Sequence, residues 1–202
     1  MNYRNVFYKY VRYLLTTKND PARAGKVLKQ MNDLISLDLF PLSADFELEI
    51  GRLFDMCGMP DEAQQMGVRA LASSQEIIKS KEIRERERIN EDGAQAELLL
   101  AESASLAGNY AIAKATYQQI ASRTRGVDPL LSYKMDELDV LKLERAKDLN
   151  GALAKAEGLR AKYSMAAADR RSQEAAMELE QKISALQKRL GRSPQAVLSM
   201  TP

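Results

Sequence analysis

Few side chains in this sequence could perform chemistry. The chain has no histidine, which excludes His-dependent triads, HExxH metal sites and Cys/His zinc sites. The single cysteine, Cys57, has no base near it in the sequence, so we interpret it as a buried structural thiol. The acidic pairs Asp61-Glu62 and Glu91-Asp92 are better explained by helix starts and loop solvation than by catalysis. No GxG or GK[ST] phosphate loop is present. We therefore expect no enzyme activity, no metal and no cofactor.

The N-terminal stretch combines aromatic and basic residues. Its apolar residues recur at helical spacing over 3–17, with cations between them: Tyr3, Phe7, Tyr10 and Leu14, interleaved with Arg4, Lys9 and Arg12. Stacking on bases with phosphate contacts would use such residues, but a core or a groove uses the same spacing far more often. The net charge of the whole chain is only +2, so we expect no nucleic-acid partner.

Charge is distributed unevenly along the first eighty residues. Residues 1–43 carry 7 Lys or Arg against 3 Asp or Glu, a local charge of +4, whereas residues 44–79 carry 3 against 7, a local charge of −4. The two segments either complement each other across an interface or form two solvated faces. The second alternative is favoured, because surface ion pairs contribute little to stability.

The elements around Cys57 are two amphipathic helices joined by a short break. Ile50, Leu53 and Phe54 recur at helical spacing before Cys57-Gly58-Met59-Pro60, and apolar residues recur again behind it. Gly58 suits a helix C-terminus because glycine accepts positive φ, and Pro60 suits the first turn of the next helix. The stretch therefore predicts a helical hairpin with a tight turn.

The order Gly51, Phe54, Gly58, Ala63, Ala70 resembles the tetratricopeptide repeat (TPR), a helix pair of about 34 residues with alternating small and large signature positions. The pattern recurs around Gly108, near the N-terminus around Pro21, and more weakly around residue 152. One alanine marks each copy, and the intervals are 39, 50 and 39 residues between Ala24, Ala63, Ala113 and Ala152. The resemblance implies an all-α, right-handed solenoid of about four antiparallel hairpins over residues 1–163.

The same resemblance implies that the protein is a scaffold that binds a protein or peptide on the concave face, which the first helix of each hairpin builds. Carried over by position, that face contains Lys9, Tyr13, Leu48, Arg52, Asp55, Leu98 and Glu102. Some TPR domains use a lysine and asparagine clamp there for the carboxylate of chaperone tails. Lys9 fits the first lysine, but Tyr13 and Glu49 stand where the asparagines would be, so such a ligand is not expected.

Residues 164–190 predict one long C-terminal helix, for which Ser164 is a suitable cap. Its apolar residues form a heptad seam of Ala176, Leu179, Ile183, Leu186 and Leu190. The helix either covers the open end of the fourth hairpin or forms a coiled coil that would make the protein a homodimer; the capping role is favoured. Residues 191–202 are expected to be a flexible tail.

A fainter resemblance concerns about the first 60 residues. Residues 2–8 with Asp38-Leu39-Phe40-Pro41-Leu42 resemble the soluble C-terminal region of bacterial membrane proteins related to protein O-mannosyltransferases. This resemblance implies an accessory domain, periplasmic if the chain is a fragment of such a protein. Otherwise no stretch approaches the ~20 apolar residues of a membrane span, and we expect a soluble, cytoplasmic protein without membrane insertion.

Overall fold

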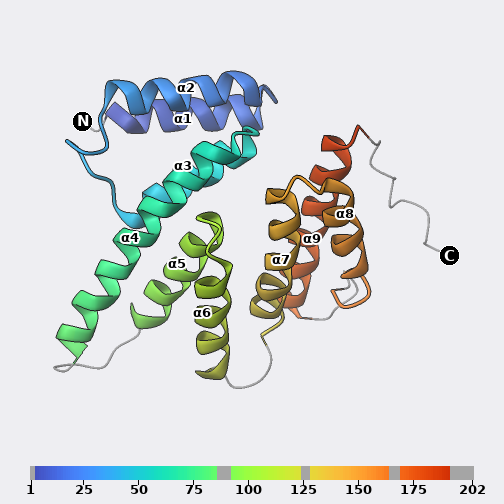
Figure 1. Ribbon diagram of the computed structural model, residues 1–202. Helices are drawn as coiled ribbons and strands as arrows, with labels where there is room; N and C mark the ends of the chain where they lie inside the picture. The colour runs from blue at the N-terminus through green and yellow to red at the C-terminus, as the bar shows by residue number, and fades with distance from the viewer. Residues whose placement is uncertain (1–2, 86–91, 124–127, 164–168, 192–202) are drawn as a thin grey trace. The chain divides into compact units, whose positions relative to one another are not determined.

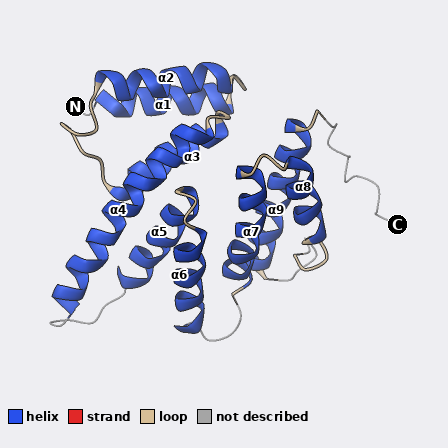
Figure 2. Ribbon diagram, viewed as in Figure 1, coloured by secondary structure: helices blue, strands red, loops and turns tan. Residues whose placement is uncertain are grey.

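The protein is all-helical in the computed structural model, which describes residues 3–85, 92–123, 128–163 and 169–191 (Figures 1 and 2). No strand occurs in these ranges. No helix within them is both long and apolar enough to cross a membrane. The helices are α1 (Tyr3–Thr16), α2 (Pro21–Leu34), α3 (Ala44–Met56), α4 (Pro60–Glu85), α5 (Asp92–Leu106), α6 (Tyr110–Arg123), α7 (Pro129–Arg145), α8 (Leu149–Gly158) and α9 (Arg170–Arg189).

The chain forms two compact units, residues 1–116 and 117–202, and the division falls within α6. In the first unit α1 packs on α2, α3 on α4, and α5 on both α3 and α4. Figure 1 shows α1 and α2 as an antiparallel pair. One hydrophobic core joins the first two hairpins, and its largest buried side chains are Val11, Leu14, Leu28, Met31, Ile50 and Phe54.

Four short turns with the same backbone feature join α1 to α2, α3 to α4, α5 to α6 and α7 to α8. Each contains one residue with positive φ, namely Asn19 (49°), Gly58 (73°), Gly108 (79°) and Lys147 (61°). A left-handed residue ends a helix by directing the chain away from the axis, which explains why two of the four are glycine.

The four second helices begin at residues 21, 60, 110 and 149, so that each marker alanine lies three residues after a helix start. All four alanines are at most 1 % exposed: Ala24, Ala63, Ala113 and Ala152. Their unequal spacing therefore reflects hairpins of unequal length with the same local construction. The all-α fold that the sequence predicts is confirmed for the described residues.

Glycines allow close packing between successive hairpins. A Cβ at Gly67 in α4 would lie 2.6 Å from the backbone nitrogen of Ala107, in the turn between α5 and α6. A Cβ at Gly25 in α2 would lie 3.3 Å from the Cβ of Cys57, in the turn between α3 and α4. Gly51 admits the Leu106 side chain from α5. Gly51 and Gly67 thus both lie where the third hairpin approaches the second.

The second unit is formed by α7, α8 and α9, each packed on the other two. The heptad seam of α9 faces this unit, and Leu179, Ile183 and Leu186 are at most 1 % exposed. A coiled-coil dimer through the same seam would first have to open the unit. Hydrogen bonds and ion pairs flank the seam. One of them is a bidentate ion pair, in which Arg160 Nε and a terminal guanidinium nitrogen each lie 2.9 Å from a Glu180 oxygen.

The start of α9 differs from the expectation. The helix begins at Arg170 after Asp169, whose carboxylate accepts a hydrogen bond of 2.8 Å from the backbone N–H of Ser172. An N-terminal cap satisfies an otherwise unpaired N–H, and aspartate does this as well as serine. The predicted cap, Ser164, and the predicted flexible tail beyond residue 191 lie outside the described residues.

Candidate binding surface on the first helices

The cysteine and the acidic pairs considered for chemistry in the sequence lie in the surroundings described here. Within the described residues, no three His, Cys, Asp or Glu side chains are grouped so that they could hold a metal ion. Cys57 is half-buried, and its burial raises the pKa of the thiol to about 11. Glu62 forms an ion pair with Lys29 of α2, and the hydrogen bond from Lys29 is the main cause that lowers the pKa of Glu62. Asp61 is exposed, and Glu91 is not among the described residues.

The register between the first helices follows from the hydrogen bond that closes each turn. The backbone N–H after the left-handed residue donates to Phe54 in the α3–α4 turn, at 3.0 Å, and to Ala104 in the α5–α6 turn, at 2.8 Å. In the α1–α2 turn the equivalent bond, at 2.9 Å, reaches Leu14, and this turn is one residue longer. Leu14, Phe54 and Ala104 are therefore equivalent positions.

Counting back from these positions places Tyr8 with Leu48 and Leu98, and Arg12 with Arg52 and Glu102. Sequence reasoning had assigned Lys9 and Tyr13 to the binding face, one residue further along α1. The difference arises from the extra residue in the first turn, which shifts the positions of α1 relative to α3 and α5. Counting back from Pro21 and Pro60 gives Lys9 and Tyr13, because the extra residue lies between the end of α1 and Pro21.

Polar side chains connect the three first helices in a row, which we call the first-helix row: Tyr8, Arg12, Glu49, Arg52 and Glu102. The Tyr8 hydroxyl donates to Glu49 Oε1 at 3.0 Å and accepts from Arg12 at 3.1 Å, which connects α1 to α3. Arg52 donates to Glu102 Oε2 at 2.7 Å, which connects α3 to α5. The structure thus brings Arg52 and Glu102, two of the predicted residues, into direct contact.

The other predicted residues are distributed differently. Leu48 is only 3 % exposed and so presents no side chain to a partner. Asp55, Leu98 and Lys9 are exposed. Tyr13 is 43 % exposed, and its ring stacks on that of Tyr10, whose centroid is 6.4 Å away. Tyr13 therefore lies beside Tyr10 on α1 and does not belong to the first-helix row.

Arg4 has a role that sequence reasoning did not identify. Its side chain is 4 % exposed and donates to the carbonyl oxygens of Ile35 and Ser36, at 3.0 and 3.2 Å, where α2 ends. Burial lowers the pKa of the guanidinium. Arg4 therefore satisfies carbonyls that the last turn of a helix leaves without partners. It no longer belongs to the set of cations that could contact phosphates.

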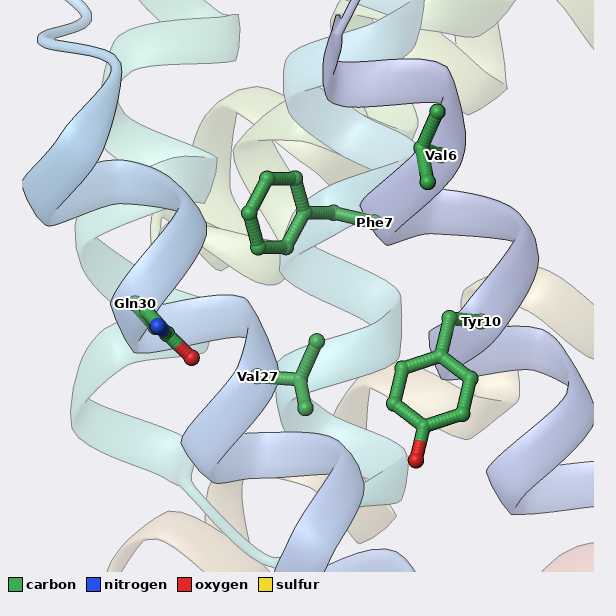
Figure 3. A pocket seen from close by; sticks show the side chains of 5 residues that line it. All are labelled: Val6, Phe7, Tyr10, Val27 and Gln30. Carbon is green, nitrogen blue, oxygen red and sulfur yellow. The ribbon is translucent and has the colours of Figure 1, made fainter.

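A second surface feature lies between α1 and α2, on the side of this hairpin that faces away from α3. It is a shallow pocket to which α1 contributes three side chains and α2 contributes two, Val27 and Gln30 (Figure 3). Val6, Phe7 and Tyr10 are the residues from α1. We call this feature the outer groove.

Comparisons of the chain with protein-family models, with curated proteins and with solved structures found no significant match.

Proposed function

We propose that the four helix pairs are copies of one TPR-like repeat and that the protein is a non-catalytic module for binding a protein or peptide. In the first unit the hairpins stack as a right-handed solenoid, and the first helices line its concave face. Two features support the repeat: the shared turns and the glycines at both hairpin junctions. Stacked repeats of this kind create extended concave surfaces, which such proteins use for binding.

The observation that carries the proposal is the first-helix row. Successive first helices present polar side chains beside one another, and Arg52 lies 2.7 Å from Glu102 across the junction of α3 and α5. Their side chains are 48 % and 23 % exposed, so both remain available to a partner. Exposed Asp55 and Leu98 extend the surface, whose mixed charge suits a ligand of mixed polarity.

Charge reversal of one ion pair tests the proposal. Arg52→Glu combined with Glu102→Lys keeps an ion pair between α3 and α5 but inverts its direction. Stability should stay within about 0.5 kcal/mol of the parent, since exposed pairs contribute ~0–1 kcal/mol. Proteins cross-linked to the parent in native lysate and identified by mass spectrometry should be lost from the double variant.

A matched control is Glu76→Lys on α4, which reverses an exposed acidic residue on a second helix. It should retain the partners of the parent. A set of partners that is the same for the parent, the double variant and the control would contradict binding at the first-helix row.

A further inference from the structure

The face of α3 that meets the preceding hairpin is a stripe of Phe46, Ile50, Leu53 and Cys57. The ring of Phe46 lies 5.5 Å from the ring of Tyr8 in α1, and Cys57 lies against Gly25 in α2. Ile50 and Leu53, between them on the same stripe, are 0 % and 4 % exposed. Both helices of the preceding hairpin thus contact this stripe, α1 at Phe46 and α2 at Cys57.

The equivalent stripe of α5 is covered in the same way. Ser103, which is equivalent to Leu53, is fully buried, and its hydroxyl lies 3.4 Å from that of Ser74 in α4. Ala107, which is equivalent to Cys57, meets Gly67 of α4. At both junctions a glycine of the preceding second helix meets the end of the stripe, although Gly67 lies about one helical turn further along α4 than Gly25 lies along α2.

In α1 the stripe contains the residue types of a buried stripe but is exposed. Val6, Tyr10 and Tyr13 occupy the positions of Phe46, Ile50 and Leu53, and they are 59 %, 37 % and 43 % exposed. Val6 and Tyr10 line the outer groove (Figure 3). A solenoid end that meets only water carries polar residues there, so this end of the first unit has the composition of an interface.

The fourth hairpin supplies a contrast. In α7 the positions equivalent to Tyr10 and Tyr13 are Asp139 and Lys142, which are exposed and form an ion pair of 3.4 Å. A first helix of this protein can therefore carry a polar stripe. The aromatic stripe of α1 is not a requirement of the hairpin itself.

Charge indicates which kind of helix the outer groove would accept. At the α2–α3 junction, Lys29 of the preceding helix pairs with Glu62, which is the third residue of α4. The third residue of α2 is Arg23, whose guanidinium carbon lies 5.7 Å from the centroid of the Tyr10 ring. Lys18 lies at the same distance over Tyr13. Neither cation has an ion-pair partner among the described residues. The open side of α1 therefore has a positive residue, Arg23, where the α2–α3 junction has a negative one, Glu62.

We infer that the outer groove binds an amphipathic helix of another protein, which packs on α1 as α2 packs on α3. The helix carries a glycine or alanine opposite Thr17, as Gly25 lies opposite Cys57. Four residues later it carries a carboxylate that pairs with Arg23, where α2 itself has Lys29. Its apolar face covers Val6 and Tyr10. This interaction is additional to the proposed function and uses a different surface.

Two stapled helical peptides with the sequence of residues 21–34 test the inference on the full chain, one unchanged and one with Lys29→Glu. Stapling removes the cost of forming a short helix in water. By calorimetry, the Lys29→Glu peptide should bind at least about 10-fold more tightly than the unchanged one, a difference of ~1.4 kcal/mol. Arg23→Glu in the protein should reverse this preference, because the coupling then favours lysine.

Tyr10→Asp should abolish binding of both peptides, whereas Val68→Asp, a matched change at an exposed apolar residue of α4, should not alter it. Arg52→Glu should also leave binding unchanged, which separates this surface from the first-helix row. The inference is overturned if neither peptide saturates the protein at ~1 mM, or if binding survives Tyr10→Asp. Sedimentation that reveals a dimer abolished by Tyr10→Asp would also overturn it, because a second copy would then occupy the groove.

Discussion

Replacing Gly67 by alanine tests the hairpin junction directly. The added Cβ would lie 2.6 Å from the Ala107 nitrogen, 2.7 Å from the Leu106 carbonyl carbon and 3.0 Å from the Ala107 Cα. All three are backbone atoms of one turn, so no side-chain rotation relieves the contact. The turn must move by several tenths of an ångström relative to α4. Overpacking of this kind costs ~1–3 kcal/mol.

Helix propensity acts in the opposite direction. Alanine within a helix is more favourable than glycine by up to ~1 kcal/mol, so with this full offset the net loss for Gly67→Ala is about 0–2 kcal/mol. For a domain of this size, each kcal/mol lowers Tm by roughly 2–4 °C. Gly51→Ala should cost less than Gly67→Ala, since the atom nearest to its Cβ is the Leu106 Cδ2, at 2.5 Å, which belongs to a flexible side chain.

Gly158→Ala is the matched control, because a Cβ at this position in α8 would meet nothing within 4 Å. Only helix propensity then changes, and Tm should stay constant or rise. Thermal and urea unfolding followed by circular dichroism measure all three variants. A Gly67→Ala protein that gains stability as the Gly158→Ala protein does would refute the close approach of α4 to the α5–α6 turn.

Three further predictions concern the second unit, the thiol and the turns. Leu179→Ala should destabilise the protein by about 2–5 kcal/mol in urea unfolding, because it leaves a cavity among α7, α8 and α9. Because the seam of α9 is covered within this unit, light scattering of the parent should show a mass that does not depend on concentration. At pH 8 the thiolate of Cys57 should be about 100-fold less populated than in unfolded chain, so Ellman's reagent should react slowly until urea is added. Because folding raises the pKa of Cys57, the protonated thiol makes its full contribution to the free energy of unfolding below about pH 9. This contribution is lost as the pH rises toward about 11. Lys147→Gly should raise stability by about 0.5–1 kcal/mol, since glycine relieves the positive φ; an unchanged or lower midpoint of urea unfolding would contradict this.

The sequence indicated the hairpins because their signals are local. A left-handed residue and a proline or capping residue determine each turn within a few positions, and the marker alanine follows at a fixed distance. Gly58 and Pro60 are clear examples. The start of α9 was predicted less well, because Ser164 and Asp169 are chemically similar caps and the choice between them depends on where the helix meets α7 and α8.

The first-helix row was harder to predict because it depends on the register between hairpins. One additional residue in the turn before Pro21 moves the row from Lys9 and Tyr13 to Tyr8 and Arg12. The burial of Leu48 and of Arg4 follows from packing between segments distant in sequence, which no local pattern encodes. Helical periodicity identifies a stripe on each helix, but it does not identify the neighbour that covers it.

The residues that stabilise this fold differ from those of the two proposed binding surfaces. The junctions depend on small side chains such as Gly67 and on buried residues such as Ile50, where one added or lost methyl group is costly. The Arg52–Glu102 pair is partly exposed and contributes ~0–1 kcal/mol, so its charges can be reversed with little effect on folding. Tyr10 and Tyr13 of α1 are also exposed and do not belong to the hydrophobic core. The first-helix row and the outer groove can therefore be altered separately, and the Arg52→Glu and Tyr10→Asp variants test the two proposed interactions one at a time.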